Sequence, residues 1–244
     1  MNAVAILGAS GTIGSTLARR LTNQGRSLLL VGRNPDKLAA LSAELKQPAV
    51  TVDFTRSDSL EEALRASAEM LGGLSGIVNC IGSVLLKPAH ATSDDDFRAT
   101  IETNLFTAFA AVRAGAKLMR QRGGSIVLFA SAAAELGIAN HEAIAAAKAG
   151  VIGLARSAAA TYATNNLRVN VISPGLVRTE LTRRIWETPA NEAASTQLHA
   201  LGRLGEPRHV ASFAAWLLDD ENDWVTGQVF GVDGGLGHVL ARRS

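Results

Sequence analysis

The stretch Val4-Ala-Ile-Leu7-Gly8-Ala-Ser-Gly11-Thr-Ile-Gly14 decides the fold of this chain. Its first four residues predict a buried strand that ends at Leu7, and a helical stretch, Thr12–Asn23, begins within the glycines. Strand, tight turn and helix in this order are the context in which spaced glycines hold a dinucleotide. An ordinary glycine-rich loop is the alternative, and the flanking strand and helix argue against it.

Each glycine of this turn has its own predicted role. Gly8 makes the turn, Gly11 lets the backbone approach a pyrophosphate, and Gly14 lets the helix pack close to the sheet. The N-terminus of the helix then faces the phosphate charge. The residues predicted to bind the cofactor here are Gly8, Ser10, Gly11, Thr12, Ile13 and Gly14.

Beyond the turn, short apolar runs alternate with longer helical stretches. This alternation predicts an α/β protein: one doubly wound Rossmann domain over residues 1–244, with a mainly parallel seven-stranded sheet and helices on both faces. The predicted strands are Val4–Leu7, Leu28–Val31, Val50–Asp53, Gly76–Asn79, Ser125–Ala130, Arg168–Ile172 and Val229–Val232. The predicted helices are Thr12–Asn23, Asp36–Leu45, Leu60–Leu71, Asp94–Arg120, His141–Tyr162 and Pro207–Leu218.

Composition argues against several other classes of protein. A single cysteine cannot build a disulfide framework, and no run approaches the roughly 18 apolar residues of a membrane span. The net charge is +2 and the basic residues are scattered among acids, so no nucleic-acid-binding stripe is expected. We therefore expect a cytoplasmic protein with a small-molecule substrate and with no nucleic acid, membrane or metal partner.

The end of the second strand bears on the choice between the two nicotinamide dinucleotides. NAD-selective sites place an acid there for the 2′-hydroxyl of the ribose, whereas this chain has Arg33. A guanidinium can pair with a 2′-phosphate, so NADP(H) is predicted and NAD(H) is less favoured. Two alternatives stay open: a solvated surface Arg33, or Asp36 as the acid, although Asp36 follows Pro35 and looks like the start of the next helix.

Together these motifs resemble the short-chain dehydrogenase/reductase family in its compact cytosolic branch, and they are most similar to the β-ketoacyl-acyl-carrier-protein reductases. The resemblance runs from Gly8 to Gly235. It implies an oxidoreductase that transfers a hydride between NADP(H) and a small molecule. It also implies a mobile substrate lid at about residues 179–204, and a homodimer or homotetramer formed through the helices of residues 94–120 and 142–162. The second of these helices is rich in Ala and Gly, which let helices approach closely.

The resemblance implies further cofactor contacts after the predicted strands. Asp53 matches the family acid that contacts the adenine amino group. Asn79-Cys-Ile-Gly82 matches the segment that supports the nucleotide side of the sheet, and Pro174-Gly175 with Thr179 matches the segment that cradles the nicotinamide. The complete set predicted beyond the glycine turn is Arg33, Asp53, Phe54, Asn79, Gly82, Lys148, Pro174, Gly175, Val177 and Thr179.

Three matches concern catalysis. Asn104 matches a helix asparagine that holds a water on the family's proton relay, and Ser131 matches the serine that orients the substrate. Lys148 matches the lysine of the family's Tyr-x-x-x-Lys pair. Each also has a structural alternative: a buried helix asparagine, a polar strand terminus and a surface lysine, respectively.

Two positions depart from the family pattern. The middle glycine of the turn comes one residue earlier than is usual, which shifts the turn locally and leaves binding intact. The larger departure is the missing tyrosine, because the segment that matches Tyr-x-x-x-Lys reads Ile144-Ala-Ala-Ala-Lys148. Ser131 upstream and Lys148-Ala-Gly fix this register, and the only tyrosine, Tyr162, has Asn166 four residues later.

Positioned acid–base catalysis is typically worth about 10²–10⁴-fold in rate, so the loss of the tyrosine has to be explained. His141, beside Glu142, lies within one turn of Ile144 and is a tentative replacement, since histidine titrates near neutrality. Alternatively the substrate, such as an enone, needs no protein acid, or water donates. A third explanation is a non-catalytic NADP(H)-binding sensor or partner subunit. We favour an oxidoreductase for small, largely apolar carbonyl, alcohol or enone substrates.

Overall fold

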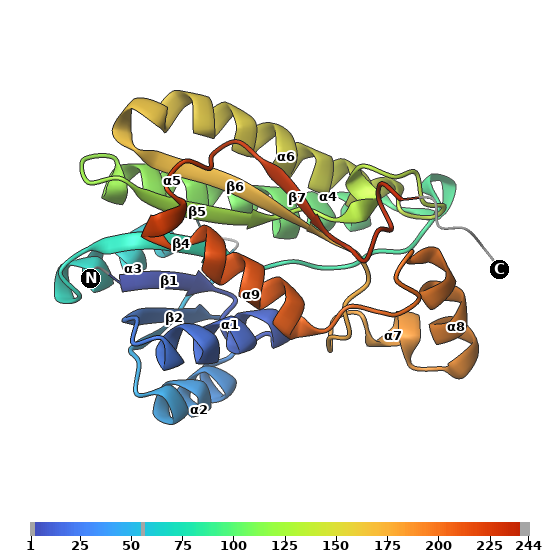
Figure 1. Ribbon diagram of the computed structural model, residues 1–244, viewed down its shortest axis with the longest axis horizontal. Helices are drawn as coiled ribbons and strands as arrows, with labels where there is room; N and C mark the ends of the chain where they lie inside the picture. The colour runs from blue at the N-terminus through green and yellow to red at the C-terminus, as the bar shows by residue number, and fades with distance from the viewer. Residues whose placement is uncertain (1–2, 55–56, 240–244) are drawn as a thin grey trace.

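The computed structural model describes residues 3–54 and 57–239, which form one sheet covered by helices on both faces (Figure 1). Residues 1–2, 55–56 and 240–244 of the predicted domain lie outside these ranges. All neighbouring strands are parallel, in the order β3-β2-β1-β4-β5-β6-β7. The chain reverses its direction of winding between β1 and β4, and doubly wound sheets bind ligands beyond the strand ends at such a point. The predicted α/β Rossmann fold is confirmed.

The seven strands lie close to where the sequence predicts them. The fourth strand begins two residues earlier than predicted and the sixth ends two residues later. The third strand ends at Thr51 rather than at Asp53, because its neighbour in the sheet, β2, ends at Gly32 and leaves nothing to pair with. The bounds are β1 Ala3–Leu7, β2 Leu28–Gly32, β3 Ala49–Thr51, β4 Leu74–Asn79, β5 Gly124–Phe129, β6 Leu167–Pro174 and β7 Val229–Val232.

The predicted helix Asp94–Arg120 is interrupted by a wide π-helical turn, Glu102–Phe106. Two short helices inside the predicted lid were not predicted, because segments of 4 and 10 residues with a largely polar composition carry no clear apolar period. The helices are α1 Thr12–Asn23, α2 Pro35–Leu45, α3 Ser57–Met70, α4 Asp94–Ile101, α5 Thr107–Met119, α6 Glu142–Tyr162, α7 Arg183–Trp186, α8 Pro189–Leu198 and α9 Pro207–Leu217.

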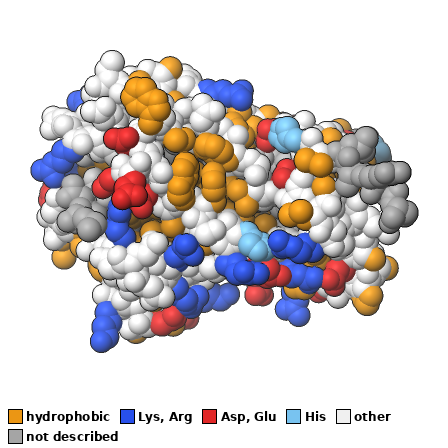
Figure 2. Space-filling view, viewed as in Figure 1, with side chains coloured by type: hydrophobic (Ala, Val, Ile, Leu, Met, Phe, Trp, Pro, Cys, Tyr) orange, Lys and Arg blue, Asp and Glu red, His pale blue; other side chains and the backbone are white. Residues whose placement is uncertain are grey.

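Strand side chains alternate between two apolar layers. Val4 and Ile6 of β1 point into the layer under α1 and α9, whereas Ala5 and Leu7 point into the layer under α5 and α6. Because both faces of the sheet are covered, the strands read as continuous apolar runs rather than as alternating ones. On the face seen in Figure 2, apolar side chains also reach the surface over α9 and β7.

The long helix α6, together with the turn that follows it, is long and apolar enough to cross a bilayer. Half of its apolar window is buried inside the domain, and the helix packs along β6. A buried core helix meets the same length and composition criteria as a membrane span. The packing therefore accounts for its apolar character.

Candidate active site

The glycine turn has the geometry that a pyrophosphate requires. Gly8 has a φ of 77°, which disfavours residues with a side chain. A Cβ atom on Gly14 would lie 2.4 Å from the carbonyl oxygen of Gly8. Gly11 caps α1 without a side chain, and the first turn of α1 carries no acid. The first N–H groups of the helix have no helical acceptor and therefore suit an anion.

Two residues that could distinguish NADP(H) from NAD(H), Arg33 and Asp36, follow β2 and lie in different surroundings. Arg33 is exposed just after β2. Asn34 caps α2 by accepting a hydrogen bond from the N–H of Lys37, and Asp36 lies in the first turn of that helix. The interpretation of Asp36 as the start of a helix is thus confirmed. Arg33 is left as the charged side chain at the strand end.

Asp53 and Phe54 follow β3, and their side chains differ in exposure to solvent. Asp53 is exposed beyond the strand. The Phe54 side chain is only 6% exposed and belongs to the apolar core. Phe54 can therefore contact a nucleotide through its main chain, whereas its ring is committed to packing.

Asn79 and Asn104 hold the loop after β4 in place. The Oδ1 atom of Asn79 accepts a hydrogen bond from Ile81 N–H at 3.2 Å, and its Nδ2 donates to the Thr107 hydroxyl at 3.3 Å. Asn104 lies in the π-helical turn, where its Oδ1 accepts from Ser83 N–H at 3.1 Å and its Nδ2 donates to Ser83 Oγ at 2.9 Å. Both amides are buried and engaged. In this arrangement the Asn104 side chain fastens the loop.

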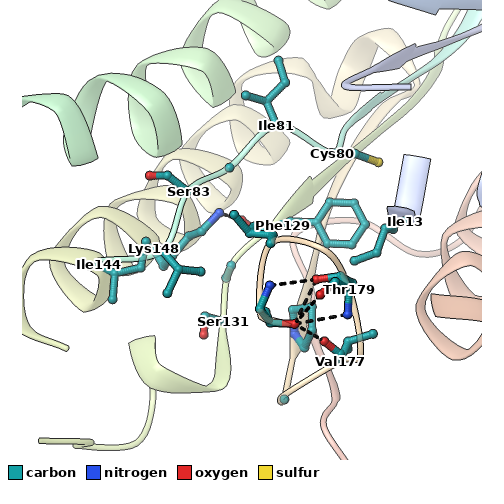
Figure 3. Close-up of a pocket in the computed structure, with 17 residues that line it drawn as sticks. Ile13, Cys80, Ile81, Ser83, Phe129, Ser131, Ile144, Lys148, Val177 and Thr179 are labelled. Carbon is teal, nitrogen blue, oxygen red and sulfur yellow. Dashed lines mark hydrogen bonds between the residues drawn. The ribbon is translucent and has the colours of Figure 1, made fainter. Parts of the chain in front are cut away.

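Beyond the strand ends lies a cleft whose inner pocket has a cavity volume of about 150 Å³ (Figure 3). It joins residues that are far apart in the sequence, from the glycine turn to the segment after β6. The residues that line it include Ile13, Cys80, Gly82, Ser83, Phe129, Ser131, Ile144, Lys148, Pro174, Gly175, Val177, Thr179, Leu181 and Thr182. Most of the residues predicted at the nicotinamide end are thus brought together.

Ser131 and Lys148 occupy this pocket with different hydrogen-bonding capacity. Ser131 Oγ accepts a hydrogen bond from Ala133 N–H at 3.2 Å, which leaves its own O–H able to donate. The Lys148 ammonium donates to the carbonyl oxygen of Phe129 at 2.9 Å, and the residue is only 7% exposed. The alternative of a surface lysine is therefore wrong.

Burial sets the pKa of two groups in the inner pocket. Desolvation lowers the pKa of Lys148 to about 8, because a buried ammonium loses its hydration. The same effect raises the pKa of the Cys80 thiol to about 12. Lys148 therefore exchanges its proton in the neutral range, and Cys80 stays a neutral thiol.

An outer pocket adjoins the inner one and shares Ser131, Ile144 and Thr182 with it. Its further walls are mainly apolar, and His141 and His199 are its only residues, among those the structure describes, that carry an ionisable side chain. These walls include Ala132, Ala133, Ile138, His141, Ile185, Ser195, Leu198, His199 and Leu236. Ile144 therefore stands where the two pockets meet.

Two groups of polar contacts, one around Thr182 and one around Arg178, hold the predicted lid of residues 179–204. Thr182 Oγ1 accepts hydrogen bonds from Thr179 N–H at 3.2 Å and from Trp186 Nε1 at 3.2 Å. Arg178 pairs with Glu192 of α8, lies 3.5 Å from Glu206 before α9, and covers the Trp186 ring at 5.2 Å from its centroid. Trp186 thus packs within the lid and does not line either pocket.

Sequence reasoning missed several residues of the cleft. Thr182 and Leu181 lie close to Thr179 and were covered only by the predicted lid, whereas Phe129 and Cys80 end or follow a strand, as ligand-facing residues of such sheets do. His199 gave no signal in the sequence, because only the fold brings it to Leu176. Within residues 3–54 and 57–239, no cluster of three or more His, Cys, Asp or Glu side chains could hold a metal ion.

Comparison with known proteins places this site in a family. Residues 8–237 match the family model described as enoyl-(acyl carrier protein) reductase. D-threitol dehydrogenase of Mycolicibacterium smegmatis is 31% identical over 236 residues, covering 94% of this chain and 90% of that protein. The 3-oxoacyl-[acyl-carrier-protein] reductase of Mus musculus is 32% identical over 238 residues, covering 95% and 96%.

A solved structure agrees with the sequence relatives. The short-chain type dehydrogenase/reductase from Mycobacterium ulcerans superposes with a TM-score of 0.94 at 32% identity, covering 98% of this chain and 91% of that one. The chain therefore belongs to the short-chain dehydrogenase/reductase family of oxidoreductases, as its motifs predict.

Proposed function

We propose that this chain is an NADP(H)-dependent oxidoreductase that interconverts a small, largely apolar carbonyl compound or enone and its reduced product. The observation that supports this most is the cleft whose inner pocket brings together Ile13 of the glycine turn, Ser131 and Lys148 (Figure 3), and which adjoins an apolar outer pocket. A nicotinamide held there supplies or accepts the hydride. The chain's residues bind it, orient the substrate oxygen through the Ser131 hydroxyl, and exclude water.

The cofactor fits the observed turn. Gly14 lets the start of α1 lie directly against the Gly8 carbonyl, where a Cβ atom would come within 2.4 Å of the oxygen, and the first turn of α1 carries no acid that would repel a phosphate. We assign the pyrophosphate to this turn and the nicotinamide to the inner pocket, between Ile13 and the Pro174–Thr179 segment. Asp53, exposed after β3, is the proposed partner of the adenine.

The outer pocket determines the kind of substrate. Side chains such as Ile138, Leu198 and Leu236 form its walls, and no Lys, Arg, Asp or Glu lines it among the described residues. A charged substrate would lose hydration there without gaining a partner. We therefore expect aliphatic, alicyclic or aromatic ketones and enones to bind better than phosphorylated or carboxylated analogues.

The test of this proposal is NADPH oxidation by the purified protein across a panel of apolar ketones, aldehydes and enones. Transfer of deuterium from labelled NADPH to the product, detected by mass spectrometry, would establish hydride transfer. Tight NADPH binding without turnover of any panel member would instead favour the sensor or partner-subunit alternative. We expect the protein to act in the cytoplasm, where NADPH is supplied.

Arg33 carries the proposed preference for NADP(H). Replacing it with glutamine is expected to weaken NADPH binding by about 10- to 100-fold, because a charge-assisted hydrogen bond contributes about 1.5–3 kcal/mol. NADH affinity, measured by the same fluorescence titration, should change by less than about threefold, since NADH lacks the 2′-phosphate. Equal losses for both dinucleotides, or tighter NADH binding by the unaltered protein, would contradict the assignment.

The proposed assembly rests on an exposed apolar surface. Phe97 of α4 is 43% exposed and Phe109 of α5 is 45% exposed, and a Cβ atom on Gly153 of α6 would meet nothing within 4 Å. We propose that a second copy of the chain packs on this surface. A tetramer needs one more interface, for which the apolar surface over α9 and β7, with Trp216 41% exposed, is the candidate (Figure 2).

A bulky charge on α6 should therefore separate the subunits. Gly153→Arg is expected to shift the mass measured by light scattering to that of a smaller species, because the guanidinium would be buried without a partner. Ala43→Arg, at an exposed position of α2, is the matched control and should leave the mass unchanged. A monomeric unaltered protein would refute the assembly itself.

A further inference from the structure

The cleft lacks a tyrosine at position 144, so another group has to supply the proton when a carbonyl oxygen is reduced. Four side chains that line the cleft in the described chain can exchange a proton in principle: Cys80 and Lys148 in the inner pocket, and His141 and His199 in the outer one. No carboxylate lines either pocket within residues 3–54 and 57–239. Each of the four makes different contacts, and these contacts decide which one is suited to the task.

Cys80 and His199 are unsuited. Burial raises the pKa of the Cys80 thiol to about 12, which makes it a weak acid at neutral pH. His199 uses both ring nitrogens: its Nε2 accepts a hydrogen bond from Leu176 N–H at 3.1 Å, and its Nδ1 lies 2.8 Å from the carbonyl oxygen of Ser195. A neutral ring that donates from Nδ1 satisfies both partners and has no proton left for a substrate.

His141 is less well placed than Lys148. Its Nδ1 is 2.8 Å from the carbonyl oxygen of Ala139, which leaves only Nε2 for another partner. It lines the outer pocket and does not line the inner one, where the nicotinamide is proposed to bind. A donor has to reach the substrate oxygen beside Ser131, at the junction of the two pockets.

Lys148 lines the inner pocket with Ser131 and Ile144, one turn along α6 from Ile144 (Figure 3). One of its three N–H groups is donated to the Phe129 carbonyl oxygen, and that bond fixes the position of the nitrogen. A Cβ atom on Gly82 would lie 3.6 Å from Lys148 Nζ, so the glycine keeps that side of the ammonium uncovered. Ile144, where the two pockets meet, carries no hydroxyl that could donate a proton in place of Nζ.

We propose that the Lys148 ammonium is itself the proton donor, reaching the substrate oxygen directly or through one water. The proposal rests on the reductase function proposed above. In the step, the carbonyl carbon gains a hydride from the reduced nicotinamide, the C=O π bond breaks, and its electron pair takes a proton from Nζ. The products are an alcohol, the oxidised nicotinamide and a neutral lysine, which water reprotonates.

The pH dependence has a definite sign. Reduction needs the ammonium form, so kcat/KM is highest below the pKa of the donor and falls tenfold per pH unit above it. Because desolvation places the pKa of Lys148 at about 8, the fall should begin near pH 8. A histidine donor with an ordinary pKa would give a fall near pH 6.5 instead.

The test combines variants with a measurement that does not depend on turnover. In the unaltered protein without cofactor, ¹⁵N NMR of lysine Nζ should show one signal titrating near pH 8, and this signal should be missing from Lys148→Arg. That variant keeps a cation beside the proposed nicotinamide site but holds its proton too tightly to donate it. Its NADPH affinity should stay within about fivefold of the unaltered protein, while kcat falls by about 10²-fold or more.

His141→Gln tests the rival donor. In this variant the fall of kcat/KM with rising pH should still begin near pH 8, even if KM changes. Two results would overturn the proposal: a Lys148 Nζ signal that titrates above pH 10, or a Lys148→Arg variant that retains kcat. If the fall of kcat/KM with pH disappears in His141→Gln, the proton donor is His141 rather than Lys148. A protein that binds NADPH but never transfers deuterium would refute the proposed function, while the titration of Lys148 would still be measurable.

Discussion

Replacing Ile144 with tyrosine is expected to raise the rate of ketone reduction by about 10²-fold, within the range of positioned acid–base catalysis. Residues four apart share a helix face, so a phenol at position 144 lies beside the Lys148 ammonium and projects to the junction of the two pockets. A nearby cation lowers the pKa of a phenol toward the working range. The donor would then be closer to the substrate oxygen than Lys148 is.

The measurement is kcat for NADPH oxidation with the best ketone of the panel. Ile144→Phe is the matched control, because it adds the ring without the hydroxyl and should give no gain. If tyrosine and phenylalanine give the same rate, the proton is not what limits turnover. A gain confined to tyrosine would show that the remaining catalytic residues are correctly arranged.

Gly14→Ala is expected to have the largest effect on the cofactor site. Its Cβ atom would lie 2.4 Å from the Gly8 carbonyl oxygen, so the start of α1 has to move away from the turn. Overpacking of this kind typically costs about 1–3 kcal/mol, and the displaced N–H groups would no longer meet a pyrophosphate. We expect the free energy of unfolding to fall by about 3 kcal/mol and NADPH affinity to fall more than tenfold.

Chemical denaturation and fluorescence titration measure the two effects. Gly137→Ala is the control, since a Cβ atom there would contact nothing within 4 Å and its φ is not in the left-handed region. It should change neither quantity appreciably. Unchanged NADPH binding by Gly14→Ala would mean that the pyrophosphate lies elsewhere.

The strands and the glycine turn could be predicted because each depends on residues that are neighbours in the sequence. Leu28–Gly32 is a continuous apolar run, as strands buried on both faces are, and Gly8, Gly11 and Gly14 lie together between a strand and a helix, although the middle glycine departs from the usual spacing. The end of β3 could not be predicted, since it depends on where β2 stops. The lid helices were missed because polar pairs such as Arg178 and Glu192, rather than an apolar stripe, hold them.

Within the site, the sequence predicted which residues are present better than it predicted what surrounds each of them. The register of Ile144 and Lys148 was evident from the motif. That Lys148 is buried, and that its pKa therefore falls to about 8, depends on the carbonyl of Phe129 and on Gly82, which come from two other strand ends. The engagement of His199 with Leu176 likewise exists only in the folded chain.

The wide turn at Glu102–Phe106 constrains the length of this segment rather than its composition. A π-helical turn holds one residue more than an α-helical turn, so it takes up an inserted residue while the helices on either side keep their packing. Removing one residue here would let the segment close into an ordinary α-helix, with α5 still packed on the sheet. Asn104 would then lose the position from which it bonds Ser83. A one-residue deletion in this turn should therefore loosen the loop after β4 more than it disturbs the packing of α5.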